Sequence, residues 1–213
     1  MKEWSKLVVR SMQKIDKKYI NNVVIKALKE DLSPKGDLTT KLIISKNKIV
    51  KAKIISKQDG IISGLDFCKT AFKIIGKETI FKKKIKDGKK VKKNDTIAEI
   101  YAKTKTILIA ERTALNFLNH ASGISTMTNK FVKKINYRTK ICCTRKTTPN
   151  LRLLEKYAVK KGGGYNHRYN LSDEILIKDN HIAIDKNIEN IVKRSIKNKK
   201  GKKITVEVDN LKQ

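Results

Sequence analysis

Two stretches in the first half of the chain repeat apolar residues at the spacing of an amphipathic helix. The first lies in residues 17–30 and ends before the turn-rich segment SPKGDLTT (33–40). Its apolar positions are Ile20, Val23, Val24, Ala27 and Leu28. The second stretch begins after a turn bracketed by Gly60 and Gly64. Its inner face would hold Leu65, Cys68, Ala71, Phe72 and Ile75. Both stretches are predicted to be helices.

The segments around these helices have the patterns of strands. Residues 49–56 form one predicted strand, and KIKDGKKVKKNDTIAEIYAKT (84–104) alternates strands with turns at Asp87-Gly88 and Asn94-Asp95. Helices and antiparallel strands together predict an α+β domain over residues 1–112. Nothing in the pattern of this domain points to catalysis.

A third helical pattern covers residues 109–121 and is predicted to connect two domains. Arg112 lies opposite its apolar stripe, so this side chain is either a surface residue or reaches a neighbouring site. The segment SGIST (122–126) is predicted to be a turn, followed by a second helix over 127–135.

Strands and helices alternate in the second half, over residues 113–213. The apolar run 141–143 and the segment KITVEV (203–208) are predicted strands. One predicted helix has Thr148 as its N-cap, begins at Pro149 and ends at Gly162, and another covers residues 188–196. This order is typical of parallel βα units. An eight-stranded barrel needs many more residues, so the α/β chain is predicted to hold an N-terminal α+β domain and an incomplete (β/α) barrel.

The chain carries 51 basic and 20 acidic residues, a formal net charge of +31. Such a charge raises the possibility of a basic nucleic-acid-binding protein. The excess is spread along the chain and is mostly lysine, and aromatic residues make up only 6%. Lys, Ile and Asn are encoded by A/T-rich codons, so a biased genome is the simpler explanation. Five of the seven arginines lie between positions 112 and 168. Specific nucleic acid binding is therefore not expected.

The location of the protein is predicted from what the chain lacks. No apolar run approaches the roughly 20 residues that span a membrane, and MKEWSKLVVRSMQK (1–14) has no secretory apolar core. Three cysteines, two of them adjacent at Cys142 and Cys143, do not form a disulfide framework. We expect a cytoplasmic protein.

The segment 144–181 concentrates cationic side chains beside glycines and short turns. Arg145 and Lys146 would follow the strand at 141–143, at the end where sheet enzymes keep their chemistry. Guanidinium groups bind carboxylates and phosphates through two parallel hydrogen bonds. The anion-binding set is Arg145, Arg168 and Lys178, with His167 as a hydrogen-bond donor. The segment thus predicts a site for a substrate with several carboxylates or phosphates.

Several other residues have two interpretations. Glu207 and Asp209, at the end of the last predicted strand, could hold Mg²⁺ through oxygen ligands or belong to a solvated face. The triple glycine 162–164 is a helix cap with a tight turn, or a cradle for phosphate. His120 is read as a packed or surface histidine rather than a ligand. The spacing of the remaining histidines fits no zinc motif.

The chain resembles the quinolinate phosphoribosyltransferase family over most of its length. The motifs that carry the resemblance are EDLSPKGDLTT, with Asp31 and Asp37, then ERTALNFL, SGIST, TRKTTPNLR, EKYAVKKGGGYNHRYNLSDEILIKDNHI and VEVDNL. The resemblance implies an enzyme of NAD synthesis. It would join quinolinate to 5-phosphoribosyl-1-pyrophosphate with Mg²⁺, giving nicotinate mononucleotide, pyrophosphate and carbon dioxide.

The resemblance also implies a role for each matching residue. Arg145, His167, Arg168 and Lys178 would bind the two carboxylates of quinolinate. Arg112 would enter the same pocket from the partner subunit of a homodimer. The remaining residues would hold substrate, the phosphoribosyl donor or magnesium; they are Thr144, Lys146, Glu207 and, for the metal, Asp209.

Two departures from the family pattern lead to further expectations. The family often has aspartate where this chain has Cys143, and loss of a buried hydrogen bond there would loosen the strand end by roughly 1 kcal/mol. The family also continues with further barrel strands, an LDN motif, an E-x-S-G segment and an S-x-G turn. We therefore expect the 213-residue chain to be a fragment or a decaying gene product with little stability or activity. An inactive remnant, or a relative with another anionic substrate, remains an alternative.

Overall fold

The computed structural model describes residues 14–136 and 138–213. The N-terminal segment that was examined for a secretory core lies almost entirely outside the described residues. The described chain forms two compact units, divided between Asn166 and His167. Each unit is described by itself below.

The first unit begins with two capped helices. Helix α2, Lys17–Leu32, starts at Asp16, whose side chain accepts a hydrogen bond from the Tyr19 backbone N–H, and it buries Ile20, Val24 and Leu28. This confirms the first predicted helix. The expected turn segment is wrong in its second half, because α3, Leu38–Ile43, begins within it. Asp37 caps α3 through the Thr40 backbone N–H.

A three-stranded antiparallel sheet follows, in the order β1-β5-β3. The strands are β1 (Ile49–Ile55), β3 (Ile80–Lys83) and β5 (Thr96–Lys103). A small second sheet pairs β2 (Gly60–Ile61) with β4 (Lys90–Val91). Helix α4, Leu65–Ile75, buries its apolar face as predicted, except that Ile75 is only half-buried. The predicted strand at 49–56, the strand through Ile97, Glu99 and Tyr101, and the two turns are confirmed, with Gly88 and Asn94 at positive φ. The strand predicted at 84–86 is wrong, because β3 ends at Lys83 and residues 84 and 85 form a bend.

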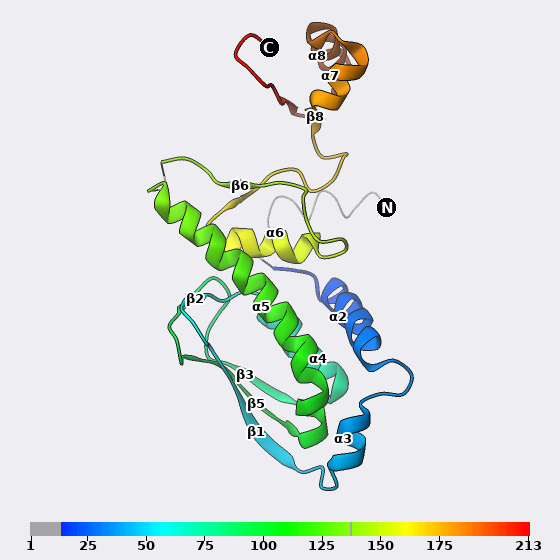
Figure 1. The fold of residues 1–213 in the computed structure, drawn as a ribbon, viewed down its shortest axis with the longest axis vertical. Helices are drawn as coiled ribbons and strands as arrows, with labels where there is room; N and C mark the ends of the chain where they lie inside the picture. The colour runs from blue at the N-terminus through cyan, green and yellow to red at the C-terminus, as the bar shows by residue number, and fades with distance from the viewer. Residues whose placement is uncertain (1–13, 137) are drawn as a thin grey trace. The chain divides into compact units, whose positions relative to one another are not determined.

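Strand β5 passes directly into α5, Thr104–Lys134, a single helix of 31 residues (Figure 1). The predicted turn at SGIST is therefore wrong. The small polar residues of this segment serve close packing instead: Ser125 Oγ donates to the Ala158 backbone oxygen at 2.7 Å, and Thr126 Oγ1 accepts from the Ile61 backbone N–H at 2.9 Å. Their hydroxyls bind neighbouring elements while the helix continues.

The first unit ends with a parallel strand pair and a helix. Strand β6, Cys142–Cys143, runs parallel to β7, Tyr165–Asn166. Helix α6 lies between them in sequence, from Arg152 to Lys161. The predicted N-cap at Thr148 is wrong, because residues 148–151 form a turn, with Asn150 at φ 65°, before the helix begins. The predicted helix end at Gly162 is confirmed.

The triple glycine serves the packing of α6 on α5. A Cβ added at Gly162 would lie 2.4 Å from the Ser125 backbone oxygen, and one at Gly164 would lie 2.8 Å from Thr128 Cγ2. Gly163 has φ +93°, which favours glycine. These contacts support the cap-and-turn interpretation of the three glycines.

The second unit also holds a parallel pair, β8 (Ile175–Ile177) with β9 (Ile204–Val206). Helix α7, Asp179–Asp185, was not predicted, whereas α8, Ile188–Asn198, confirms the last predicted helix. The last strand ends before Glu207, and Asp209 lies in a bend. The strand predicted over 203–208 is therefore shorter than expected, and both acids lie beyond its end. The α+β start and the later parallel βα pattern confirm the α/β class. Among the described residues, no helix combines the length and apolarity that crossing a membrane requires.

Candidate active site

Each cationic segment of the predicted site directly follows a parallel strand. Thr144, Arg145 and Lys146 follow β6, His167 and Arg168 follow β7, and Lys178 follows β8. Glu207 follows β9 in the same way. In α/β proteins this is the end of the strands at which ligands bind. Four successive strand ends therefore carry all but two of the predicted site residues.

The segment 144–148, which we call the 144–148 loop, is folded by short-range hydrogen bonds. The Lys146 backbone N–H donates to Thr144 Oγ1 at 3.1 Å, and the Thr147 backbone N–H donates to the Arg145 oxygen at 2.9 Å. Arg145 is half-buried, whereas Thr144 and Lys146 are exposed. The loop thus brings three predicted site residues together within the first unit.

Helix α6 contacts this loop through charged side chains that the sequence patterns missed. The Glu155 carboxylate accepts the Thr148 backbone N–H at 3.2 and 3.3 Å and lies 2.9 Å from His120 Nε2. Lys156 Nζ donates to Cys143 Sγ at 3.1 Å. Both residues are buried. Two adjacent charges at otherwise buried helical positions are a signal that could have revealed them. His120 is exposed and paired with a carboxylate, as its surface interpretation allows.

Glu174 organises the start of the second unit. Its carboxylate lies 3.5 Å from His167 Nε2, and its backbone oxygen accepts from Arg168 Nη1 at 3.3 Å. His167 and Arg168 are therefore brought together around one acidic residue.

Lys178 and Glu207 stand at the ends of adjacent parallel strands, and Lys178 Nζ lies 3.7 Å from Glu207 Oε2. The backbone N–H of Lys178 donates to His181 Nδ1 at 3.0 Å, which gives that histidine a role at the start of α7. Lys178 and Glu207 are thus a pair, whereas the convergence of the cations of both units into one pocket stays a prediction.

Arg112 lies on the exposed side of α5. Its neighbour Thr113 donates from Oγ1 to Asp31 Oδ2 at 3.1 Å, which connects α5 to α2. Asp31 and Asp37, the two acids of the N-terminal motif, therefore have structural roles as a helix–helix contact and a helix cap. Arg112 itself is a surface residue, one of its two predicted placements.

The donor set for magnesium is small. Among residues 14–136 and 138–213, no group of three or more His, Cys, Asp or Glu side chains is arranged to hold a metal ion. Mg²⁺ commonly uses one or two carboxylates together with water and the phosphates of a substrate. Glu207, whose side chain is 58% exposed, fits such a shared site, and Asp209 is exposed two residues later.

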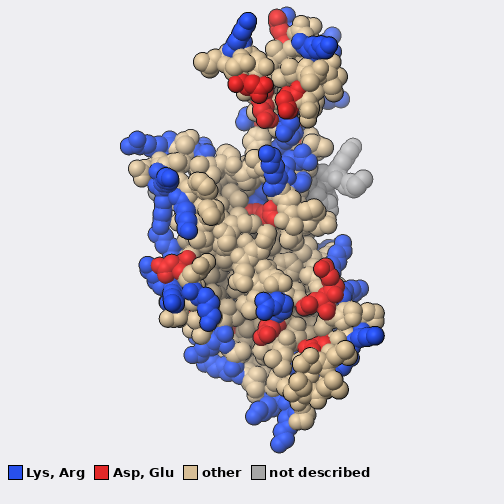
Figure 2. Space-filling model, in the orientation of Figure 1, with Lys and Arg blue, Asp and Glu red and all other residues tan. Residues whose placement is uncertain are grey.

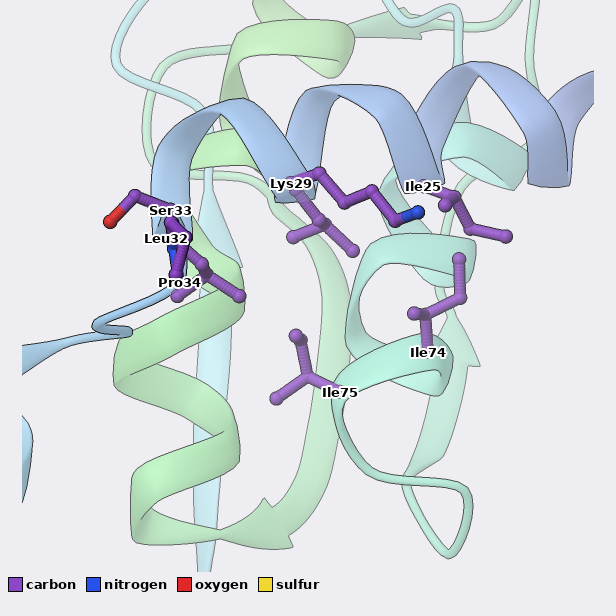
Figure 3. Close-up of a pocket in the computed structure, with 8 residues that line it drawn as sticks. Ile25, Lys29, Leu32, Ser33, Pro34, Ile74 and Ile75 are labelled. Carbon is purple, nitrogen blue, oxygen red and sulfur yellow. The ribbon is translucent and has the colours of Figure 1, made fainter.

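An apolar hollow of about 540 Å³ lies between α2 and α4 (Figure 3). Its lining consists of Ile25, Leu28, Lys29, Leu32, Ser33, Pro34, Ile74 and Ile75. None of these is a predicted site residue, and a lining with a single ammonium group does not suit a dicarboxylate or a pyrophosphate. The anion site is therefore sought at the strand ends and not in this hollow.

Comparison with known proteins agrees with the motifs. Residues 37–122 match the family model of the quinolinate phosphoribosyl transferase N-terminal domain, and residues 124–213 match that of the C-terminal domain. A probable nicotinate-nucleotide pyrophosphorylase [carboxylating] from Methanocaldococcus jannaschii is 44% identical over 201 residues, which cover 92% of this chain and 69% of the relative. One from Bacillus subtilis is 40% identical, over 91% of this chain and 65% of its own length.

Solved structures show the same relationship. The crystal structure of NadC from Streptococcus pyogenes has a TM-score of 0.87 and 39% identity, covering 93% of this chain and 72% of that one. The nicotinate-nucleotide pyrophosphorylase from Francisella tularensis has a TM-score of 0.88 and 37% identity, covering 95% and 71%. The chain therefore belongs to the quinolinate phosphoribosyltransferase family, enzymes that transfer a phosphoribosyl group to quinolinate with decarboxylation in NAD synthesis.

Proposed function

We propose that this chain joins quinolinate to 5-phosphoribosyl-1-pyrophosphate and releases pyrophosphate and carbon dioxide, leaving nicotinate mononucleotide. The observation that carries the proposal is the succession of cationic residues directly after parallel strands β6, β7 and β8. Fixed cations at strand ends suit a substrate pair made of a dicarboxylate and a polyphosphate.

In this proposal, four side chains bind the two carboxylates of quinolinate: Arg145, His167, Arg168 and Lys178. The guanidinium groups would each grip a carboxylate through two parallel hydrogen bonds. Glu174 supports this arrangement because it holds His167 and Arg168 at the same place in the free protein. Lys178 would exchange its contact with Glu207 for a substrate carboxylate.

The phosphoribosyl donor would be held by Thr144, Lys146 and Glu207. Glu207 and Asp209 would hold Mg²⁺, which when bound neutralises the charge of the pyrophosphate group. Lys146 is exposed on the 144–148 loop and carries a compact charge suited to a phosphate oxygen.

The reaction requires no covalent protein nucleophile. The bond from ribose C1 to pyrophosphate breaks while the pyridine nitrogen of quinolinate forms the new bond to C1. The 2-carboxylate then leaves as carbon dioxide, and a proton replaces it on the ring. The fixed cations contribute by holding the dianion in line with C1 and by stabilising the departing negative charge.

The proposed enzyme works as a homodimer in which Arg112 completes the partner's pocket. Two observations support this: the side chain is exposed on α5, and the neighbouring Thr113–Asp31 bond fixes that part of the helix against α2. An arginine held on a rigid helix can reach a second molecule with little loss of conformational entropy.

Calorimetry of quinolinate binding to the Arg145→Ala variant tests the pocket. The expected loss is at least about 2 kcal/mol, because a charge-assisted bidentate contact disappears. Arg138→Ala, at an exposed position seven residues earlier in the chain, is the matched control and should bind like the parent. Equal binding by the parent and Arg145→Ala would contradict the assignment.

A further inference from the structure

Three charged residues on the first turns of α6 contact the 144–148 loop or the strand that leads into it. Arg152 Nε donates to Thr147 Oγ1 at 3.0 Å, Glu155 accepts from Thr148, and Lys156 donates to Cys143. The loop that carries Arg145 and Lys146 is therefore bonded to one helix just before its first residue and again at its last two residues. Within the loop, the backbone N–H groups of Lys146 and Thr147 make local bonds, to Thr144 and Arg145.

Glu155 is buried, with 9% of its surface exposed. Burying a carboxylate is costly unless hydrogen bonds compensate. Here both carboxylate oxygens face the Thr148 backbone N–H, at 3.2 and 3.3 Å, and one of them lies 2.9 Å from His120 Nε2 on α5. Glu155 thus fixes the end of the loop to both α5 and α6.

Lys156 has only 1% of its surface exposed. Its Nζ lies 3.1 Å from Cys143 Sγ, and the same sulfur lies 3.3 Å from Asn166 Oδ1 on β7. Burying an ammonium group, like burying a carboxylate, costs desolvation free energy unless hydrogen bonds compensate. Lys156 therefore fixes the last residue of β6, directly before the loop begins.

We propose that Glu155 and Lys156 are positioning residues that hold the two ends of the 144–148 loop, so that Arg145 and Lys146 project from a preorganised backbone. The role of the loop in binding substrate rests on the proposed function. The contacts of Glu155 and Lys156 with the loop and with β6 are independent of that function. Side chains that bind a substrate need support of this kind, because small misplacements of a binding group lose much of its effect.

Hydrogen exchange of backbone amides in the full chain tests the positioning directly. In Glu155→Gln the Thr148 amide should exchange at least about tenfold faster than in the parent, the consequence of weakening one charge-assisted bond. In Lys156→Met the amides of Lys146 and Thr147 should exchange faster in the same way. The methionine keeps the length of the buried side chain, so this second variant serves if Glu155→Gln fails to fold.

Tyr157→Phe is the matched control because it lies on the same helix and also loses one buried hydrogen bond. Tyr157 donates from its hydroxyl to Asp87 Oδ2 at 2.8 Å, away from the loop. Burial, together with Asp87, raises the pKa of Tyr157, so the phenol is a neutral donor. This variant should leave the loop amides at the parental rate.

Quinolinate calorimetry on the same variants separates this inference from the proposed function. Glu155→Gln and Lys156→Met should weaken binding about tenfold, and Tyr157→Phe should not. If the parent fails to bind quinolinate while the loop amides respond as expected, the proposed function fails and the positioning role stands. Unchanged loop exchange in Glu155→Gln and Lys156→Met, or the same acceleration in Tyr157→Phe, would overturn the positioning role.

Discussion

Glu99 shows how single acidic side chains organise a lysine-rich surface. On β5 its carboxylate lies 2.7 Å from Lys51 Nζ and 3.0 Å from Lys84 Nζ. Hydrogen bonds from Lys51, and then from Lys84, lower the pKa of Glu99 to about 2. One carboxylate therefore connects β1, β5 and the segment after β3.

This pairing predicts a specific dependence of stability on pH. Because the folded pKa of Glu99 lies below the value near 4.3 expected for unfolded chains, its contribution is fully present above that value. It should be lost as pH falls towards 2. Urea denaturation should show the parent more stable than Glu99→Gln at pH 6, with the difference shrinking as pH is lowered. A constant difference between pH 5 and pH 2 would contradict the pairing.

The candidate site residues that the sequence patterns predict are those with an unusual local context. Arg145 and Arg168 stand out because arginine is scarce in this chain. Arg145 also follows a short apolar run, and His167 lies beside Arg168 after the triple glycine. Glu155 and Lys156 were missed because they are buried by contacts with α5, with β6 and with the 144–148 loop. The spacing of apolar residues within α6 cannot predict such tertiary contacts. Local pattern therefore finds residues with an unusual chemical context better than it finds residues that are buried by tertiary contacts.

The glycines after helix α6 pack closely against helix α5, and the contribution of this contact to stability can be measured. Gly162→Ala should destabilise the chain by roughly 1–3 kcal/mol, because its Cβ would overlap the Ser125 backbone oxygen. Gly123→Ala is the control: Gly123 is exposed within α5 and has nothing within 4 Å of an added Cβ. It should stabilise by about 0.5–1 kcal/mol. Urea denaturation of both variants checks the pair, and equal effects would refute the assigned packing.

Elements with clear periodicity were predicted well, and their ends less well. Helices α2, α4 and α8 and strand β1 were found because each has one continuous apolar face. The single helix α5 was split in the prediction because small polar residues in the middle of a helix look like a turn. Their hydroxyls bind β2 and α6, a tertiary effect that overrides local preference. The start of α6 was misplaced because residues 148–151 form a turn, in which the Leu151 backbone N–H donates to the Thr148 oxygen, before the helix begins at Arg152.

The distribution of charge bears on the alternative of a nucleic-acid-binding protein. On the face shown in Figure 2, lysines and arginines are scattered, with acidic side chains among them. Binding a nucleic acid backbone requires a basic groove with aromatic residues along it. The scattered pattern agrees with a compositional origin of the net charge of +31.

The proposed dimer predicts that two defective variants complement each other. Arg112→Ala and Arg145→Ala should each bind quinolinate weakly by themselves. When they are mixed under conditions of subunit exchange, about a quarter of the sites should recover, because half of the dimers are mixed and each has one complete pocket. Calorimetric counting of sites measures this. Recovery of no sites, while exchange is verified by mass, would place Arg112 in its own subunit's pocket or in none.

Helix α5 crosses the boundary between the two family models, which fall at residues 122 and 124. The parts of the chain that the two models match are therefore joined by the middle of one continuous helix and not by a flexible linker. A bend in α5 at residues 122–124 would have to break the hydrogen bonds of consecutive helical turns. It would also disrupt the close packing of Gly162 against Ser125. Dividing the gene at that point would yield two fragments that each expose half of α5. The boundary between the two family models is therefore not a suitable place to divide this protein.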